Sequence, residues 1–225
     1  MNWEDECYLL SKRKFRENAN IISVFTQSKG RVSGVVYGGS SRKIRNYLQL
    51  SNKLFIIHNS KNENKLGYFK TELVKPISPL YFNDKKRTSA LLSLCYILNI
   101  LLPESQPHKN IYKSFEKFIS SINFENWIIL YIFFELNLIK DLGYDPNLEK
   151  FKNEKSISGI VKINIDNYNY EVPEYLILKE PPKEISDNLI KKSLYFTRNI
   201  IQSRFFIPNN LPFPKSRILL ENYFN

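Results

Sequence analysis

Apolar and polar residues alternate with a period of two over much of the first 75 residues. The pattern is clearest in residues 47–58, where Leu48, Leu50, Leu54 and Ile56 fall on one face. Successive side chains of a β-strand point to opposite faces, so this alternation predicts a strand that is buried on one side. Four other stretches have the same character and are also predicted to be strands: residues 7–10, 21–26, 31–37 and 66–74.

The connections between these strands are polar or rich in glycine. Residues 12–16 are predicted to form a basic turn and residues 59–64 a hairpin loop, while Gly38 and Gly39 end the third strand before a basic loop. Such a run of short strands with a basic face is typical of a small OB-type barrel, which binds oligonucleotides on its strands and loops. An SH3-like barrel would give nearly the same pattern, so both remain open.

After Pro76 and Pro79 the apolar period becomes that of α-helices. Asn83 or Asp84 can cap a first helix that Pro103 ends. Its apolar stripe contains Leu91, Leu94, Cys95, Leu98, Leu101 and Leu102, and a second stripe contains Ile111, Phe115, Phe118, Ile119 and Ile122. A third helix is predicted at residues 125–142. A fourth, long helix is predicted to begin after Ser186, which can cap it, and a short final helix is predicted at residues 215–224.

Residues 160–165 and 168–172 flank Asp166-Asn167, a pair suited to a two-residue hairpin turn. We therefore predict an α+β protein with an OB-fold β-barrel at residues 1–78. A helical-bundle domain follows at residues 79–225, with a small β-hairpin inserted at about residues 157–173.

Charge is distributed unevenly along the chain. The formal net charge is +11, with 33 Lys and Arg against 22 Asp and Glu. Residues 1–80 contain 14 basic and 6 acidic residues, a net charge of +8, whereas residues 81–225 contain 19 and 16, a net charge of +3. A basic excess favours an anionic partner, and here it is concentrated in the predicted barrel.

The stretch 27–45 is central to this excess, because a basic strand with an aromatic residue offers cations to phosphates and a ring to a base. Alternation places Arg31 and Tyr37 on one face of the predicted strand, with Val32 and Val36 on the other. The predicted nucleic-acid-binding residues are Lys12, Arg13, Lys14, Arg16, Lys29, Arg31, Tyr37, Arg42, Lys43 and Arg45. The alternative is a solvated basic rim without a ligand.

Motifs for catalysis or metal binding are missing from the sequence. Two Cys (Cys7 and Cys95) and two His (His58 and His108) lack the spacing of a metal site, and each Cys lies in an apolar run that suits a buried thiol. P-loop and serine-esterase motifs are absent. The apolar runs are too short to span a bilayer. We therefore expect a soluble, cytoplasmic protein that is not an enzyme and needs no cofactor.

Lys109, Lys113 and Lys117 recur every four residues along the second predicted helix. This spacing puts all three on one face. The stripe suits a solvated surface, or alternatively a surface that receives an acidic peptide.

Several segments together resemble the RecO family of bacterial DNA repair and recombination proteins. Residues 11–49 resemble its first barrel strands, with a G-R-V turn, a basic loop and a following L-Q. Residues 101–112 (LLPESQPHKNIY) resemble its helix connection, and residues 134–144 (FELNLIKDLGY) resemble a helix end. The closing KSR at residues 215–217 also fits, and the motifs occur in the family's order.

This resemblance implies an OB-fold domain followed by a helical domain. It implies a cytoplasmic, nucleoid-associated mediator that binds single- and double-stranded DNA, anneals complementary strands and helps to load the RecA recombinase. The implied partners are RecR and the acidic, Phe-ended tail of the single-stranded DNA-binding protein.

The sequence departs from the family pattern at two places that affect these expectations. Many relatives have a four-cysteine zinc site after the L-G-Y motif, but residues 148–173 contain no cysteine, so we predict no zinc. Phe133 stands where relatives tend to have an Arg before F-E-L. In the family this helix is linked to binding of the partner tail, so the lysines of the next basic stripe are expected to substitute for the missing Arg. The residues assigned to tail binding are Phe133, Lys109, Lys113 and Lys117.

Two other functions remain open at this point. The same barrel could serve an RNA-binding factor in translation or RNA metabolism. A nuclease would need clustered carboxylates, for which Glu135 and Asp141 are the candidates, although they lie on different faces of one helix.

Overall fold

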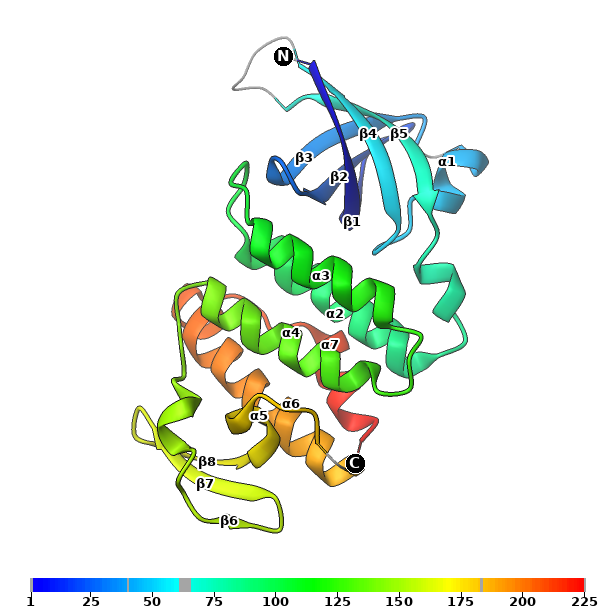
Figure 1. Ribbon diagram of the computed structural model, residues 1–225. Coiled ribbons are helices and arrows are strands. Elements are labelled where there is room, and N and C mark those ends of the chain that lie inside the picture. Colours follow the sequence, from blue (N-terminus) through cyan, green and yellow to red (C-terminus); the bar gives the residue numbers. More distant parts are fainter. Residues whose placement is uncertain (1, 40, 61–65, 183, 225) are drawn as a thin grey trace. The chain divides into compact units, whose positions relative to one another are not determined.

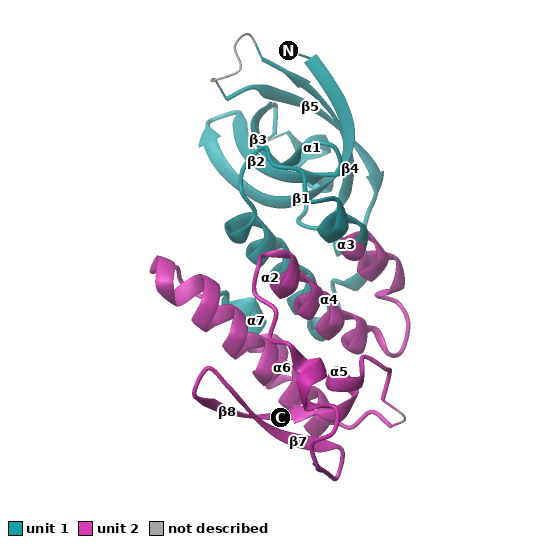
Figure 2. Cartoon of the chain, turned by 60° about the vertical axis from the view of Figure 1, so that its left-hand side comes forward, with its two compact units in different colours: residues 1–113, 214–217 teal, residues 114–213, 218–225 magenta. Residues whose placement is uncertain are grey.

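The computed structural model describes residues 2–39, 41–60, 66–182 and 184–224 (Figure 1). The chain forms two compact units (Figure 2). Unit 1 consists of residues 1–113 and 214–217, and unit 2 consists of residues 114–213 and 218–225. The division falls within two helices, α3 (Lys109–Ser121) and α7 (Lys215–Asn222).

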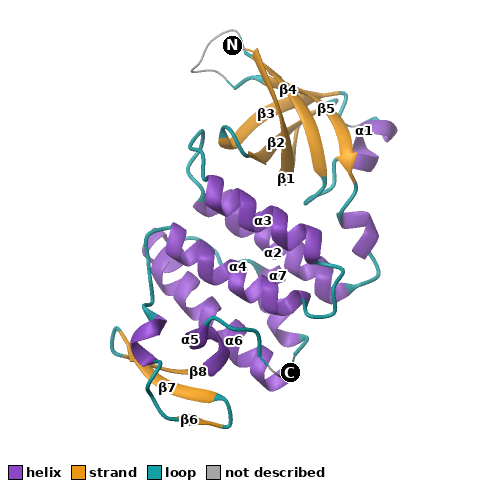
Figure 3. Ribbon diagram, in the orientation of Figure 1, coloured by secondary structure: helices purple, strands orange, loops and turns teal. Residues whose placement is uncertain are grey.

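Five strands of unit 1 close into a barrel in the order β1-β2-β3-β5-β4 (Figures 1 and 3). The elements are β1 (Asn2–Arg16), β2 (Ala19–Thr26), β3 (Gly30–Tyr37), α1 (Arg42–Tyr47), β4 (Lys53–Asn59) and β5 (Tyr68–Lys75). All neighbouring strands are antiparallel except β3 and β5, which pair in parallel. This order, with a helix between β3 and β4, is the OB-fold topology and differs from that of an SH3-like barrel.

The barrel core follows the alternation of the strands. Its buried residues are Cys7, Leu9, Ile22, Val24, Val32, Val36, Leu48, Leu54, Ile56 and Phe69. Ile44 and Tyr47 of α1 pack against this core, so the helix covers part of the barrel interior. The two faces predicted for residues 31–37 are confirmed, because Val32 and Val36 point inward and Tyr37 is exposed.

The predicted basic turn at residues 12–16 is wrong, because these residues form the second half of β1. The first half of this long strand pairs with β4 and the second half with β2. Register shifts between Leu9 and Ser11 and between Lys14 and Arg16 interrupt the alternation. Bulges of this kind bend a strand and break its alternation of apolar and polar residues. The sequence pattern of β1, which pairs with both β4 and β2, therefore looked like that of a short strand followed by a turn.

The predicted basic loop before residue 47 and the predicted strand start at Tyr47 are also wrong. Residues 42–47 form α1, and β4 begins only at Lys53. Ile44, Tyr47 and Leu48 have helical spacing and face the barrel core, but the alternating residues that follow hid this period. Of the predicted loop at residues 59–64, Asn59 ends β4 and residues 61–64 lie outside the described residues.

The helical part of unit 1 packs on the barrel. It contains the short helix η1 (Ser78–Tyr81), α2 (Lys85–Leu101) and the start of α3. Asp84 caps α2 as predicted, since its side chain accepts a hydrogen bond from the backbone N of Arg87. Cys95 Sγ lies 3.6 Å from the carbonyl oxygen of Leu9 in β1, and the ring of Tyr112 contacts that of Phe25 in β2.

Unit 2 combines helices with a small three-stranded sheet. The elements are α4 (Trp127–Asp141), η2 (Leu148–Phe151), β6 (Ser156–Ile157), β7 (Ile160–Ile165), β8 (Tyr168–Pro173), α5 (Glu174–Leu178), α6 (Asp187–Ile201), η3 (Gln202–Phe206) and η4 (Ile207–Asn209). The predicted hairpin is confirmed, and Asp166 and Asn167 both have the positive φ that its tight turn requires. The short elements β6 and α5 were not predicted from the sequence.

Two α4 side chains show how this unit is stabilised. Glu135 is buried, and its carboxylate accepts hydrogen bonds from Tyr131 at 2.9 Å and from Thr197 of α6 at 2.5 Å. Burying a carboxylate is costly unless it is hydrogen-bonded, so these partners account for its position in the core. Within the described residues, no helix is long and apolar enough to cross a membrane.

Candidate functional site

The basic residues of α1 are exposed because the opposite side of the helix faces the barrel. Ser41 caps the helix by accepting a hydrogen bond from the backbone N of Ile44. Ile44 packs on the core, which leaves Arg42, Lys43 and Arg45 in solvent. These three predicted DNA-binding residues therefore form one exposed cationic group on a short helix.

Lys12 lies beside this helix. Its Nζ donates a hydrogen bond of 2.6 Å to the carbonyl oxygen of Leu48, the residue that ends α1. Burial and the nearby charge of Arg45 lower the pKa of Lys12. The structure thus brings Lys12 together with the α1 cations, although 33 residues of sequence separate Lys12 from Arg45.

Arg13, Arg16 and Tyr37 lie on a different surface, at the end of the barrel where the β1–β2 turn lies. Arg16 is directly opposite Ala19, which is in turn opposite Tyr37. Directly opposite residues share one face of a sheet, so these side chains belong to the outer surface of β1, β2 and β3. Both arginines are exposed, and Tyr37 is 60% exposed. Lys14 is also exposed, opposite Asn20.

Lys29 and Arg31 lie at the other end of β2 and β3. Lys29 is exposed in the β2–β3 turn. Arg31 is half-buried, and its Nε donates a hydrogen bond of 2.7 Å to the carbonyl oxygen of Leu102. The carbonyl oxygen of Arg31 also accepts a hydrogen bond from Ser105 N at 2.7 Å. Arg31 therefore holds β3 to the segment that connects α2 and α3, away from the α1 cations.

The nine cations of this predicted set share one electrostatic property. Among the residues that the structure describes, none of them forms an ion pair with a carboxylate. Cations without acidic partners keep their full attraction for an external polyanion. These groups of cations therefore offer positive charge to a polyanion at more than one place on the barrel.

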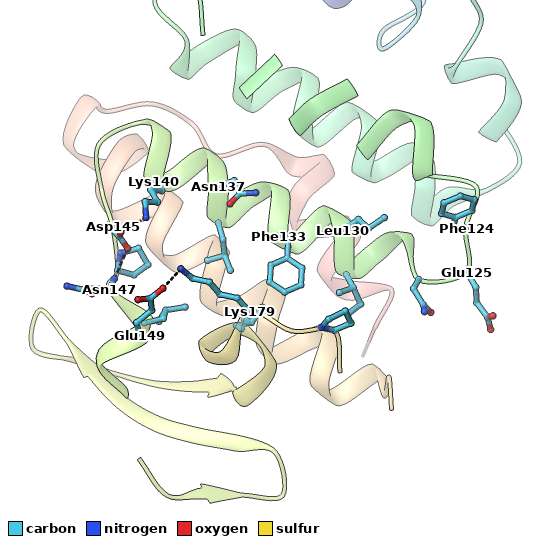
Figure 4. Close-up of a pocket in the computed structure, with 17 residues that line it drawn as sticks. Phe124, Glu125, Leu130, Phe133, Asn137, Lys140, Asp145, Asn147, Glu149 and Lys179 are labelled. Carbon is cyan, nitrogen blue, oxygen red and sulfur yellow. Dashed lines mark hydrogen bonds and ion pairs between the residues drawn. The ribbon is translucent and has the colours of Figure 1, made fainter. Parts of the chain in front are cut away.

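A second candidate site is an apolar pocket of about 690 Å³ within unit 2 (Figure 4). Its lining residues are Phe124, Glu125, Asn126, Ile129, Leu130, Phe133, Leu136, Asn137, Lys140, Asp145, Pro146, Asn147, Leu148, Glu149, Leu176, Lys179 and Pro181. This volume suits a small ligand or a few side chains of a peptide. Phe133 is half-buried here, and its ring meets that of Tyr175 at 5.8 Å between centroids.

Four of the charged groups at this pocket form two ion pairs. Lys140 Nζ lies 3.0 Å from Asp145 Oδ2, and Lys179 Nζ lies 2.5 Å from Glu149 Oε1. The hydrogen bond with Asp145 raises the pKa of Lys140, and the hydrogen bond from Lys179 lowers the pKa of Glu149. Lys109, Lys113 and Lys117 are exposed along α3 but do not line the pocket.

Sequence reasoning missed Lys140, Lys179 and the pocket itself. A signal was present, because Ile129, Phe133 and Leu136 recur along α4 at helical spacing. Of these three residues only Phe133 was assigned to a binding site, and only the fold of η2 and α5 reveals that the stripe lines a cavity.

Residues 148–173, where the family resemblance would place a zinc site, contain no cysteine. No group of three or more Cys, His, Asp or Glu residues that could hold a metal occurs in the described ranges. Instead, the turn of the β7–β8 hairpin is held by a hydrogen bond of 2.5 Å from Tyr144 to Asp166 and by an ion pair of Asp166 with Arg204. Arg204 also lies over the ring of Tyr144, 4.6 Å from its centroid.

The carboxylates considered for a nuclease do not form a site. Glu135 is fully buried and hydrogen-bonded within unit 2, whereas Asp141 is exposed at the end of α4. A two-metal site needs carboxylates that converge on accessible ions. The described residues contain no such arrangement around these two side chains.

Comparison with known proteins gives matches along most of the chain. Residues 1–77 match the family model "Recombination protein O N terminal", and residues 83–156 match "Recombination protein O C terminal". A DNA repair protein RecO from Roseobacter denitrificans is 35% identical over 150 residues, which is 66% of this chain and 62% of that protein. A protein of the same name from Caulobacter vibrioides is 25% identical over 233 residues, covering 98% of this chain and 96% of the relative.

A third relative, a DNA repair protein RecO from Cereibacter sphaeroides, is 31% identical over 150 residues. That alignment covers 67% of this chain and 62% of the relative, so the first matches span less than two thirds of the relatives' length. Both family models describe recombination proteins, and the RNA-binding alternative is not favoured.

Proposed function

Because the chain belongs to the recombination protein O (RecO) family of DNA repair proteins, we propose that it is a mediator that binds single- and double-stranded DNA and anneals complementary strands. The observation that carries this proposal is the set of nine predicted barrel cations, none of which forms an ion pair with a carboxylate within the described part of the chain. Two DNA strands repel each other through their phosphates. A surface that neutralises the phosphates lowers that repulsion and lets the strands meet.

The proposed mechanism needs no catalytic residue and no cofactor. Exposed Arg42, Lys43 and Arg45 of α1, with Lys12 beside them, contact the backbone of either strand. Phosphate contacts fix position without reading sequence. Any pair of complementary strands is therefore a substrate, and base pairing between them supplies the specificity.

The proposed partners are RecR, through which the protein helps to load RecA, and the acidic C-terminal tail of the single-stranded DNA-binding protein. The pocket of unit 2 supports the tail assignment. Its apolar walls around Phe133 suit a terminal Phe ring, and Lys140 and Lys179 at its rim can exchange their present acidic partners for carboxylates of the tail.

Strand annealing of dye- and quencher-labelled complementary oligonucleotides tests this proposal. We expect the wild-type protein to accelerate annealing and the triple variant Arg42→Ala/Lys43→Ala/Arg45→Ala to lose most of that acceleration. The matched control is Lys109→Ala/Lys113→Ala/Lys117→Ala, which removes three exposed cations of α3 and should anneal like wild type. A wild-type protein that binds DNA no better than a neutral protein would refute the proposal.

A further inference from the structure

The most exposed large apolar side chain in the described part of the chain lies at the end of η1, between the barrel and α2. Phe82 is 82% exposed, and Leu80, two residues before it, is 64% exposed. In Figure 1 this segment is the short coil that joins the end of β5 to the start of α2. Single exposed apolar residues are common on proteins, but two large ones side by side in one turn mark a contact surface. We call Leu80 and Phe82 the apolar tip.

The start of this turn is fixed to the barrel. Asn52 is fully buried, and its Oδ1 accepts hydrogen bonds from the backbone N of Ile77 at 2.7 Å and of Ser78 at 3.1 Å. Ile77 is itself buried, and its carbonyl oxygen accepts a hydrogen bond from Leu80 N at 3.1 Å. The backbone is thus anchored directly before the apolar tip.

The end of the turn is fixed to α2. The carbonyl oxygen of Tyr81 accepts hydrogen bonds from Asp84 N at 2.9 Å and from Thr88 Oγ1 at 2.6 Å. The guanidinium of Arg87 lies 6.0 Å from the centroid of the Tyr81 ring and forms an ion pair with Asp84. The apolar tip is therefore held in solvent by a backbone with partners on both sides, so little conformational freedom remains to be lost on binding.

Lysines flank the apolar tip in sequence on both sides. Residues 70–87 contain five basic and two acidic residues, a net charge of +3. Lys75 precedes the tip and Lys85 follows it, and both are exposed. Neither forms an ion pair with a carboxylate within the described part of the chain. The ligand of the tip is therefore expected to be apolar inside and negatively charged at its surface.

Two kinds of ligand have this chemistry, an acidic protein and an anionic lipid bilayer. A stable protein interface buries about 800 Å² on each partner, which two side chains do not supply. A bilayer needs no matching shape, because apolar side chains enter the boundary below the headgroups while lysines keep their charge among the phosphates. Lysine is a strongly hydrated point charge, so it suits this diffuse attraction better than a bidentate contact. The observations therefore favour the bilayer.

We propose that the apolar tip is a reversible anchor to the surface of an anionic phospholipid bilayer. Phe82 and Leu80 enter the headgroup boundary, and Lys75 and Lys85 contact the lipid phosphates. Two side chains with a few lysines give weak binding that is readily released. The anchor requires no membrane-spanning helix, and it is independent of the DNA-binding function proposed above.

The first test measures insertion directly, with vesicles of equal parts phosphatidylglycerol and phosphatidylcholine whose acyl chains are brominated. Bromine quenches a tryptophan only where the ring enters the bilayer. We expect these vesicles to quench the fluorescence that Phe82→Trp adds to the protein, and vesicles of phosphatidylcholine alone to leave it unchanged. Wild type has Trp3 and Trp127, neither of which lies in this segment, and should show no quenching. If Phe82→Trp is not quenched, the proposal is overturned.

The second test measures affinity for the same vesicles, without bromine, by co-sedimentation. Phe82→Ser and Leu80→Ser should each weaken binding by roughly tenfold, because each removes an apolar side chain that leaves water. Lys75→Gln/Lys85→Gln should weaken it by roughly 20-fold or more, at about fivefold for each lysine near the lipid surface.

Two controls match these variants. Ile157→Ser removes an apolar side chain with the same 64% exposure as Leu80, but with Ser156 and Ser158 beside it in place of lysines. Lys109→Gln/Lys113→Gln removes two exposed lysines from α3. Both should bind vesicles within about twofold of wild type, since screening by salt limits the reach of charges that do not touch the bilayer.

The outcomes that contradict the anchor are distinct. Equal losses in the tip variants and their controls would show that net charge alone holds the protein on vesicles. Wild type that ignores the vesicles, but loses a protein partner when Phe82 becomes Ser, would make the tip a protein-docking surface instead. The Ser variants should anneal oligonucleotides like wild type, which reports that they are folded. If a Ser variant unfolds, Phe82→Trp still decides the proposal because it keeps the apolar bulk.

Discussion

The barrel and the helical unit differ in how they place their cations. Among the described residues, the nine predicted DNA-binding cations of the barrel have no carboxylate partner. In unit 2, by contrast, basic side chains at many positions are paired with acidic ones. These pairs are Lys140–Asp145, Lys179–Glu149, Lys192–Glu171, Arg198–Glu221 and Arg204–Asp166.

Two lysines show the consequence in their acid–base behaviour. Burial and the charge of Arg45 lower the pKa of Lys12 in the barrel, whereas the hydrogen bond with Asp145 raises the pKa of Lys140 in unit 2. Burial first, and then the positive charge of Arg45, oppose the charged form of Lys12. The difference teaches that these unit 2 cations form internal links, whereas the nine barrel cations keep their charge available for the DNA binding proposed above.

The largest expected effect concerns Gly30, at the start of β3, where the backbone lies against Gln106. Gly30 has φ +72°, and a Cβ added there would lie 1.8 Å from the carbonyl oxygen of Gln106. Gly159 in unit 2 has a similar φ of +75°, but a Cβ there would meet nothing within 4 Å. Gly30→Ala should therefore lower the free energy of unfolding by at least about 3 kcal/mol, and Gly159→Ala by about 1 kcal/mol.

Urea unfolding followed by circular dichroism measures this difference. Because both glycines have positive φ, the Gly159 variant is a control for the intrinsic strain of Ala in that conformation. Equal losses in the two proteins would mean that the β2–β3 turn does not pack against Gln106 in solution.

The sequence was sufficient to predict the barrel, most helices and the hairpin, because each depends on a local period or a local turn. Asp166-Asn167 and the caps Asp84 and Ser186 illustrate this, since each acts within a few residues of itself. The α1 helix was not predicted, because its few apolar residues form a recognisable face only when they pack on the barrel core. Only the tertiary structure distinguishes such a turn of helix from the start of a strand.

The sequence predicted which basic residues are candidates for DNA binding but not how they are grouped. These residues were chosen from the charge distribution, the strand alternation and the family resemblance, whereas their division into groups depends on how the barrel closes. Arg31 illustrates this limit, because its hydrogen bond to Leu102 joins residues that are far apart in sequence.

The second prediction tests the difference in cation pairing directly. Each phosphate contact contributes about 0.7–0.9 to the slope of log affinity against log salt. Arg42→Ala/Lys43→Ala/Arg45→Ala should therefore reduce the slope by about 2–3. Raising the salt from 50 to 200 mM weakens DNA binding by a certain factor, and that factor should be roughly 20- to 40-fold smaller for the variant than for wild type. Fluorescence anisotropy with labelled DNA across a salt series measures the slope for wild type and for the variant.

The matched variant removes three paired cations from unit 2: Lys140→Ala/Lys179→Ala/Lys192→Ala. It changes the net charge by the same amount as the α1 variant. We expect its salt slope to equal that of wild type, because these lysines already have acidic partners. Equal reductions in the two variants would show that overall charge, and not the arrangement of the barrel, determines DNA affinity.

The third prediction concerns the apolar pocket. An acidic peptide ending in Phe should bind unit 2, and Lys140→Ala/Lys179→Ala should weaken that binding by about tenfold or more, as expected for charge-assisted hydrogen bonds. Lys113→Ala/Lys117→Ala removes cations from α3 and should leave the peptide affinity unchanged. The opposite pattern would place the tail on the α3 stripe instead of the pocket.

The smallest expected effect distinguishes the two helix caps. Burial raises the pKa of Asp84, but hydrogen bonds from the backbone and side chain of Arg87 outweigh it and lower that pKa below its ordinary value. A carboxyl group whose pKa is lower in the folded state stabilises the protein above its unfolded pKa. This contribution is lost as the pH falls below that value and through the folded pKa.

Asp84→Asn keeps an oxygen that can cap α2 but removes the charge. At neutral pH it should lower the free energy of unfolding by about 1 kcal/mol or less, and the difference from wild type should vanish in acid. Ser186→Ala removes the neutral cap of α6 and should cost about 1 kcal/mol at every pH. Urea unfolding at a series of pH values separates the two, and a loss in Asp84→Asn that does not vary with pH would show that Arg87 does not stabilise the ionised carboxylate.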